Sequence, residues 1–477
     1  MTGSDLMFIL PELILTIGGL ALLMAAAFAG DRAAQVINAL AALVLAIAIV
    51  ALMQTQESPA TLFHALRIDA FGAFAKYLIF GSAIVVLAMA PRFFEREGYR
   101  SEYPLLVVFA ALGMAIMVSA TDLMALYIGL ELNSLAAYVL ASFTRDDARA
   151  SEAGLKYFVL GALASGILLF GMSLLYGFTG ATDFASIALG FAHGHNLGLL
   201  FGLVFVLAGL AFKISAVPFH MWTPDVYEGA PTPVTAFFAS APKAAGVAVL
   251  SRVCVEAFGQ STSDWQQIIA FMAIASMLLG AVGAVGQRNI KRLLAYSSIA
   301  NVGFILIGLA AATPAGIAAV LLYLTVYVVM TLGMFLCVLQ LRNADGAMVE
   351  DISGLSGLWK HRPGLASAIA IFMFSLAGIP PLFGFWPKLM VFQAAIGAGL
   401  MPLALIGAIA SVIGAFYYLR VIKVMLFDAP TDVRFPVAGT WFERGLIALC
   451  AAYVSIIGFI VIGPLSAATA RAAGSLL

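Results

Sequence analysis

Charged residues are scarce in this sequence of 477 residues. Asp, Glu, Lys and Arg together make up 10% of it, and 63% of the residues are hydrophobic. A soluble globular protein has about 25% charged residues, so this chain has too little polar surface to cover a fold that faces water. The apolar runs recur along the whole chain, which excludes a soluble domain with one hydrophobic insert. The composition therefore predicts a polytopic membrane protein.

Residues that bind redox cofactors and metals are few and scattered. The three cysteines, Cys254, Cys337 and Cys450, form no CxxC pair, which argues against an iron–sulfur cluster and a disulfide framework. The five histidines fall in connections or at a helix break, and no two share a face of a span as a haem pair would. They are His64, His193, His195, His220 and His361. The His193–His195 spacing is a weak metal signal that is more typical of a loop, so no metal site is expected.

Two further absences limit what can drive or bind this chain. It has no Gly-x-x-x-x-Gly-Lys-Ser/Thr loop, so ATP is not the expected direct energy source. Its 24 basic residues equal its 24 acidic residues, so no basic field for nucleic acid is expected. No redox chemistry and no cofactor are predicted within the chain itself, and its energy must come from a partner.

The apolar runs predict an all-α fold of about fourteen transmembrane helices, since a bilayer core requires about 20 apolar residues per helix. The expected spans lie near residues 8–28, 33–53, 70–90, 104–120, 122–143, 153–177, 196–219, 233–258, 264–285, 293–311, 315–339, 363–395, 402–422 and 444–465. The seventh contains Pro218 and the twelfth contains Pro380-Pro381, so we expect both to be broken helices.

The basic residues of the connections predict the orientation. Sixteen Lys and Arg residues follow odd-numbered spans, whereas the opposite side has only Arg67, Arg252 and Arg471. Cytoplasmic loops of membrane proteins are rich in Lys and Arg. The odd connections are therefore expected in the cytoplasm, and both termini on the periplasmic side.

Five remaining basic residues lie within the spans, and all are lysines: Lys76, Lys156, Lys213, Lys243 and Lys388. Arginine stays charged at any accessible pH, whereas a desolvated lysine can lose its proton. A set of buried lysines is thus what proton transfer would require. The alternative for each is that its long stem carries the ammonium to the membrane surface.

Depth along the helix separates these cases. Lys213, Lys243 and Lys388 lie far from either end of their spans, and Glu131 is the deep acidic residue. We expect Glu131 and Lys213 to pair by sign and depth, although purely structural ion pairs remain the alternative. Lys156 is equally compatible with function and with a surface position. Lys76 lies near the outer face, where we expect its ammonium to reach water.

The two predicted breaks suggest an internal repeat. Each has a proline, an aromatic residue and a nearby Trp-x-Pro or Trp-Pro, and they lie five spans apart, which reverses the direction through the membrane. We therefore predict two inverted five-helix repeats, at 104–258 and 264–427. Three helices at 1–103 precede them, and a last helix within 444–477 follows.

Two stretches resemble a known family. PDVYEGAPTPVTAFFASAPK, from Pro224 to Lys243, and GQRNIKRLLAYSSIANVGF, from Gly286 to Phe304, are similar to the antiporter-like membrane subunits of respiratory complex I, the NADH:quinone oxidoreductase. The similarity is closest to the N type, the bacterial counterpart of mitochondrial subunit 2. Carried onto this sequence, the family's proton relay corresponds to Glu131, Lys156, Lys213, Lys243 and Lys388.

The resemblance implies a proton-translocating subunit in a bacterial inner membrane. It also implies that NADH, FMN, the iron–sulfur clusters and the quinone bind to partner subunits, and that quinone reduction there drives the relay. Two alternatives stay open: a subunit of an Na⁺/H⁺ antiporter, and a scaffold that does not pump. The sequence does not identify the quinone or the order of the proton-transfer steps.

Overall fold

The computed structural model describes residues 8–55, 58–62, 65–94, 98–192, 194, 196–430, 435–436 and 439–477. In these residues the chain is almost entirely helical, and the one sheet is an antiparallel pair of short strands, β1 (Ser58–Leu62) and β2 (Leu66–Ile68). The chain divides into two units. The first unit comprises Met1–Ile214, Gly229–Ile268 and Ala470–Leu477, and the second comprises Ser215–Glu228 and Ile269–Thr469.

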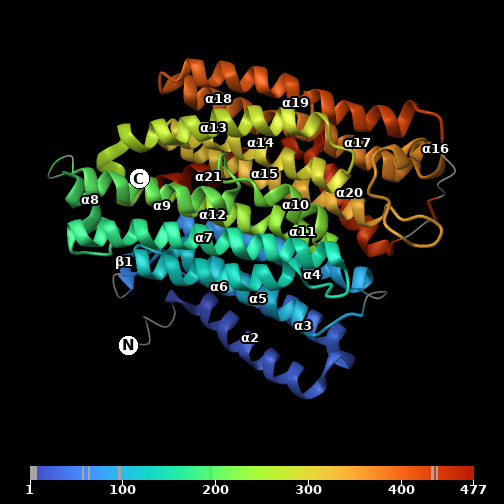
Figure 1. Ribbon diagram of the computed structural model, residues 1–477, viewed down its shortest axis with the longest axis horizontal. Helices are drawn as coiled ribbons and strands as arrows, with labels where there is room; N and C mark the ends of the chain where they lie inside the picture. The colour runs from blue at the N-terminus through green and yellow to red at the C-terminus, as the bar shows by residue number, and fades with distance from the viewer. Residues whose placement is uncertain are drawn as a thin grey trace. The chain divides into compact units, whose positions relative to one another are not determined.

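The first unit contains the N-terminal helices, the predicted fourth, fifth, sixth and eighth spans, and the seventh span as far as Ile214 (helices labelled in Figure 1). Its helices are α2 (Leu10–Ala29), α3 (Ala34–Gln54), α4 (Ala70–Phe94), α5 (Glu102–Ser119), α6 (Leu123–Ala141), α7 (Ala148–Thr179), α8 (Phe184–Ala192), α9 (Leu197–Ile214), α11 (Thr232–Ala239) and α12 (Ala241–Arg252). Helices α5, α6 and α7 lie side by side, and α7 also packs along α9. Helix α12 packs against α4, α5 and α9, so it lies in the core of this unit.

The second unit holds most of the remaining helices. They are α10 (Trp222–Gly229), α13 (Thr262–Val285), α14 (Ile290–Ala310), α15 (Pro314–Leu339), α16 (Leu358–His361), α17 (Pro363–Ala377), α18 (Phe385–Gly397), α19 (Met401–Phe427), α20 (Trp441–Val454) and α21 (Ile462–Gly474). Helices α13 and α21 each cross the boundary between the units. Helix α14 is almost fully buried, and it packs against α15, α18 and α19.

The polytopic all-α architecture is confirmed. Within the residues that the structure describes, thirteen helices are long and apolar enough to cross a membrane, compared with the fourteen spans expected from the sequence. The difference lies at predicted span 363–395, which the structure divides into α17, of 15 residues, and α18, of 13 residues. Neither piece is long enough to cross alone.

The predicted last span has different bounds in the structure. The sequence suggested 444–465, but α20 ends at Val454, and a 3₁₀ segment, Ile456–Val461, leads into α21. The segment long enough to span is Ile456–Gly474. Ser455 causes the interruption: its extended backbone ends α20, and its hydroxyl accepts a hydrogen bond from the amide of Ile457.

Both predicted helix breaks are present. Helix α9 ends at Ile214 and α10 begins at Trp222, whereas α17 ends at Ala377 and α18 begins at Phe385. Each break contains a cis peptide bond before a proline. Gly378 ends α17 with a φ of 76°, and a Cβ there would lie 2.7 Å from Lys388 Cδ. The break therefore requires glycine both for its backbone and for the approach of this lysine.

A third break was not predicted. The expected span 233–258 is interrupted at Ser240, whose φ of −118° and ψ of −85° separate α11 from α12. Pro242 lies in the first turn of α12, where a proline is tolerated because the amide there has no helical partner. This proline was the available signal. As a result Lys243 lies in the first turn of a new helix rather than in the middle of a long one.

Glycines bring α5 and α6 unusually close. A Cβ at Gly113 would lie 2.6 Å from the Gly129 carbonyl oxygen, and one at Gly129 would lie 2.7 Å from the Gly113 oxygen. Small residues permit such backbone contact between membrane helices. The contact fixes α6 two residues before Glu131, and so it positions that side chain within the first unit.

A cluster of buried charges joins the ends of α12, α4 and α5. Arg252 bonds Asp69 through Nη2 at 2.8 Å and Glu256 through Nη1 at 2.7 Å, and its Nε donates to the Val118 carbonyl at 3.0 Å. Arg67 bonds the same Glu256 at 2.9 Å. Two of the three basic residues assigned to the outer side thus have their charges balanced by carboxylates.

Candidate functional site

The lysine of the seventh span lies beside the face of α6 that carries Glu131. Lys213 is the penultimate residue of α9, and its Nζ donates to Ser134 Oγ at 2.6 Å. It also lies 5.8 Å from the centre of the Tyr138 ring. Residues three, four and seven positions apart share a helix face, so Glu131, Ser134 and Tyr138 form one stripe facing this lysine.

The predicted Glu131–Lys213 pair is close but indirect. Glu131 is near enough for its charge to act on Lys213, yet no direct ion pair joins them in the part of the chain that the structure describes. Instead, Ser134 Oγ accepts the hydrogen bond from the Lys213 ammonium. The same hydroxyl donates a hydrogen bond to the Leu130 carbonyl oxygen at 2.5 Å. Glu131 Oε1 is buried and has no hydrogen-bond partner.

Lys243 lies at the same end of α9. Its side chain is 1% exposed, and its Nζ donates to the carbonyl oxygen of Ile214 at 2.8 Å. Ile214 is the last residue of α9, where the break leaves carbonyl groups without helical partners and the helix dipole favours a cation. Lys213 and Lys243 therefore meet at one helix end, from two different helices.

Lys388 has an equivalent position in the second unit. It is 5% exposed, and its Nζ donates to the carbonyls of Leu376 and Ala377, at 3.1 and 2.9 Å, at the end of α17. Ser411 Oγ accepts a third bond at 3.3 Å, and the centre of the Phe304 ring lies 4.6 Å away. This lysine also binds the carbonyl end of a broken helix.

The other two intramembrane lysines differ from these three. Lys156 lies on α7 with its side chain 42% exposed and forms an ion pair with Glu152 at 2.7 Å. It is not brought together with the buried lysines. Lys76 was expected to reach water, and this was wrong: it is 4% exposed and bonds Glu12 at 2.5 Å. A carboxylate from α2 offsets the cost of burying its charge.

A polar network in the second unit was missed by sequence reasoning. Ser297 Oγ and Tyr418 OH lie 2.5 Å apart, Tyr323 OH donates to Asn301 Oδ1 at 2.8 Å, and Tyr327 OH donates to Ser298 Oγ at 2.9 Å. The network joins α14, α15 and α19 inside the unit. Its signal in the sequence is the polar run AYSSIAN within an apolar helix.

The side chains that could bind a metal ion are scattered in the described part of the chain. No cluster of three or more His, Cys, Asp or Glu residues occurs there that could hold an ion. The predicted loop histidines His64, His193 and His195 lie outside the described residues.

Comparison with known proteins gives one consistent result. The profile of the family described as "NADH:quinone oxidoreductase/Mrp antiporter, TM" matches residues 120–414. NADH-quinone oxidoreductase subunit N of Sphingopyxis alaskensis is 60% identical over 474 residues, which is 99% of each chain. By its name, this relative is a subunit of NADH-quinone oxidoreductase.

Solved structures agree with this result. A chain of respiratory complex I from Thermus thermophilus with bound aureothin superposes with a TM-score of 0.81 and 30% identity, covering 95% of this chain and 99% of that one. A chain of the Mrp complex from Dietzia superposes with a TM-score of 0.86 over 100% of this chain and 98% of that one. Its identity is 23%, so it shows the shared fold alone. Given the matched profile and the full-length similarity, this chain belongs to the subunit N family of NADH-quinone oxidoreductase, the antiporter-like membrane subunits of complex I.

Proposed function

We propose that this subunit translocates protons through a relay of Glu131, Lys156, Lys213, Lys243 and Lys388, driven by quinone reduction in partner subunits. The observation that carries the proposal is the position of three buried lysines. Lys213 and Lys243 lie at the end of α9, and Lys388 binds the end of α17. NADH, FMN, the iron–sulfur clusters and the quinone are assigned to the other subunits.

The chemistry of lysine supports the choice of these residues. A charged group in a membrane interior costs several kcal/mol and is usually functional. Lysine, unlike arginine, releases its proton when its surroundings change. The negative charge of Glu131 favours the protonated form of Lys213, whereas Lys213 and Lys243 repel each other when both are protonated. The protonation of each group is therefore coupled to that of its neighbours.

One buried oxygen with no partner supports a route beyond direct contacts. Glu131 Oε1 is buried without a hydrogen bond. Buried polar groups normally have a protein or water partner, so this oxygen is suited to bind water. Such water would link Glu131 to Lys213, which no direct ion pair joins.

The proposed order rests on the charge asymmetry and on the position of each lysine. Lys156, near the predicted cytoplasmic end of α7, loads the relay. Quinone reduction then perturbs Glu131 and Lys213, and the proton passes by Lys243 towards Lys388 and the periplasm. The inverted repeats at 104–258 and 264–427, with both termini periplasmic in a bacterial inner membrane, are part of this proposal.

The test removes the carboxylate of Glu131. We expect Glu131→Ala to leave complex I assembled and to lower proton pumping per NADH oxidised, and Glu131→Asp to retain part of the activity. Glu102→Ala, which removes an exposed acid from the first turn of α5, is the matched control and should pump normally. Normal stoichiometry in an assembled Glu131→Ala complex would exclude Glu131 from the relay.

The same preparation separates the rival functions. An Na⁺/H⁺ antiporter subunit would exchange ions without electron transfer, so its activity would persist when NADH and quinone are withheld. A scaffold would tolerate relay substitutions as long as the complex assembles. We expect proton uptake to require NADH oxidation and to fail in assembled relay variants.

A further inference from the structure

The break in the seventh span begins at a residue with a strained backbone. Ser215 directly follows the end of α9, and its φ of 62° lies in the left-handed region that residues other than glycine seldom adopt. The residue is fully buried, at 0% exposed. Such strain persists only where surrounding groups hold the backbone, and it is concentrated at functional sites. The contacts of Ser215 therefore indicate what the strained conformation does.

Ser215 shares a peptide group with the carbonyl that Lys243 binds. The carbonyl of Ile214 and the amide of Ser215 form one planar unit, so the backbone of Ser215 sets the direction of that carbonyl oxygen. Lys243 Nζ donates to this oxygen at 2.8 Å. Gly246, one turn further along α12, permits the close approach, since a Cβ there would lie 2.8 Å from Ile214 Cγ2. The conformation of Ser215 thus helps to point the carbonyl at the ammonium.

Two hydroxyls hold the segment between α9 and α10. Thr223, in the first turn of α10, donates from Oγ1 to Ser215 Oγ at 2.6 Å, and both residues are 0% exposed. Within the same segment, the amide of Val217 donates to Ser276 Oγ of α13 at 2.9 Å. A buried hydrogen bond is costly to lose because the freed groups have no water to replace the partner. The hydroxyl of Thr223 therefore constrains Ser215 directly.

Charged groups hold α10 itself against the start of α14. Arg292 Nη1 bonds Asp225 Oδ1 at 2.6 Å and Glu228 Oε2 at 2.9 Å. Lys291 Nζ donates to the carbonyl oxygen of Glu228 at 2.8 Å. All four residues belong to the second unit. Helix α10 is thus anchored to α14, and the hydroxyl in its first turn is kept at a fixed position.

We propose that Thr223 and Ser215 are positioning residues of the proton relay. Their hydrogen bond holds the Ile214 carbonyl in the direction that Lys243 requires. A carbonyl oxygen stabilises an ammonium more than a neutral amine, so its direction affects how readily this lysine takes up and releases a proton. Neither hydroxyl carries the proton itself. The inference rests on the proposed function, in which Lys243 belongs to the relay.

The experiment measures NADH-driven proton uptake by vesicles that contain the intact complex, normalised to assembled complex. Thr223→Val removes the hydroxyl and keeps the shape, so uptake should fall about fivefold, as expected for one hydrogen bond that supports a charged group. Thr223→Ser keeps the hydroxyl and should retain most of the uptake. Equal losses in the two variants would mean that the methyl group matters and the hydrogen bond does not, and the proposal would be wrong.

Ser215→Gly separates positioning from stability. Glycine readily adopts a positive φ, so this substitution relieves the strain and should not lower the thermal stability of the complex. It also removes the hydroxyl and frees the backbone, so proton uptake should still fall. Normal uptake in the assembled Ser215→Gly complex would show that the direction of the carbonyl is unimportant, and the positioning role would be rejected.

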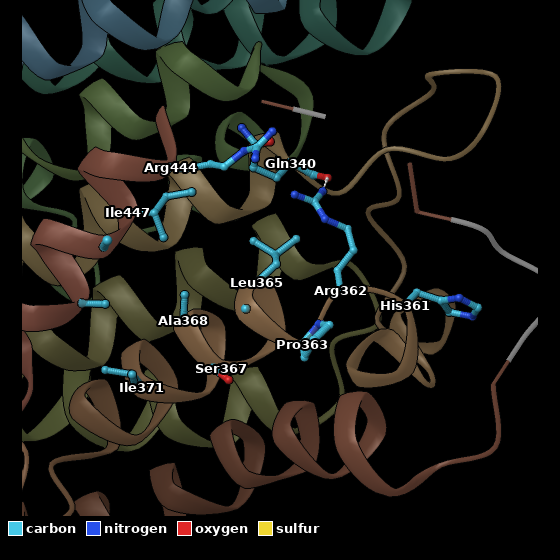
Figure 2. Close-up of a pocket in the computed structure, with 13 residues that line it drawn as sticks. Gln340, His361, Arg362, Pro363, Leu365, Ser367, Ala368, Ile371, Arg444 and Ile447 are labelled. Atoms are coloured by element: carbon cyan, nitrogen blue, oxygen red, sulfur yellow. Dashed lines mark hydrogen bonds between the residues drawn. The ribbon is translucent and has the colours of Figure 1, made fainter. Parts of the chain in front are cut away.

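Two hydroxyls away from the break provide matched controls. Ser367 lies on α17 in the second unit, at the wall of a cavity of about 520 Å³ (Figure 2). Ser251 lies on α12, is 0% exposed, and donates to the Val247 carbonyl of its own helix. Ser367→Ala and Ser251→Ala should leave uptake unchanged. Losses in both as large as that of Thr223→Val would mean that any hydroxyl among these helices has the same effect, and would overturn the proposal.

A double variant tests whether Thr223 acts through Lys243. In that case Thr223→Val should cause no further loss of uptake when Lys243→Met is already present, since two changes to one interaction are not additive. Additive losses would mean a different route and would contradict the inference. Full uptake in Lys243→Met alone would reject the proposed function as well. Impaired uptake in Lys243→Met, with normal uptake in Thr223→Val and Ser215→Gly, would reject only the positioning role.

Discussion

Lys213 and Lys388 are both buried lysines beside a helix break, but their surroundings differ in charge. Lys213 has Glu131 nearby and one hydroxyl, from Ser134, at its ammonium. Lys388 has two carbonyls, Ser411 and the face of Phe304, and no carboxylate contacts it within the described residues. The first site is balanced by an ion, and the second by dipoles and an aromatic ring.

This difference indicates that the two sites respond to different perturbations. A change in the charge of Glu131 alters Lys213 directly, because opposite charges interact strongly where the dielectric constant is low. Lys388 is held by groups whose charge does not change, including the end of α17. Under the proposed function, the first site would receive the signal and the second would respond to the arrival of a proton.

The largest effect is expected from Lys243, which lies beside the first site. Lys243→Met and Lys243→Arg should both lower NADH-driven proton uptake by about tenfold or more, because positioned proton-transfer groups contribute about 10²–10⁴-fold. Arginine keeps the charge but does not release its proton. Uptake in vesicles, normalised to assembled complex, measures this. A fully active Arg variant would remove Lys243 from the path.

The hydroxyl partners offer a direct comparison of the two sites. Ser134→Ala removes the hydrogen-bonding hydroxyl from Lys213, whereas Ser411→Ala leaves Lys388 with two carbonyls. A hydrogen bond to a charged group contributes about 1.5–3 kcal/mol, so Ser134→Ala should reduce coupled turnover severalfold and Ser411→Ala much less. Steady-state turnover of the two assembled variants decides the order. An equal or reversed order would contradict the contrast drawn above.

Lys76 belongs to neither site, so its substitution separates an effect on stability from an effect on proton pumping. Because it is buried with Glu12, Lys76→Met should lower stability by about 3–5 kcal/mol, the usual cost of breaking a buried pair, while proton pumping per assembled complex stays normal. The double variant Glu12→Gln with Lys76→Met should recover part of the loss. Thermal inactivation of the complex provides the measurement. Impaired pumping at normal stability would instead make this pair part of the relay.

The smallest functional effect is expected from single-cysteine variants. Their labelling tests how the two sites are oriented across the membrane. Single cysteines placed at 98–100, before α5, should react only with a reagent added on the cytoplasmic side, and cysteines near 192, at the end of α8, only from the periplasm. Activity should be unchanged, because both positions lie in connections. Reaction of both from one side would mean a miscounted span and would remove the inverted-repeat proposal.

Much of both lysine sites could be predicted because charge inside a membrane is rare. Lys213, Lys243 and Lys388 were identified from depth alone, and all are buried. What failed depended on contacts between distant segments. Lys76 was misjudged since its partner, Glu12, lies on another helix. The break at Ser240 was missed because Pro242, its only signal, is tolerated in the first turn of a helix and does not show by itself where a helix begins. The Tyr–Ser–Asn network of α14 was missed because the polar run AYSSIAN does not reveal its partners on α15 and α19.

The buried cluster of Arg67, Asp69, Arg252 and Glu256 has a consequence for biogenesis. Asp69 and Arg252 lie 183 residues apart in the chain, so the ribosome delivers Asp69 long before its partner. Until α12 is inserted, this carboxylate must stay hydrated at the membrane surface, because a buried unpaired charge is too costly. The start of α4 can therefore settle only when α12 arrives, and truncation before Arg252 should leave the N-terminal helices open to quality-control proteases.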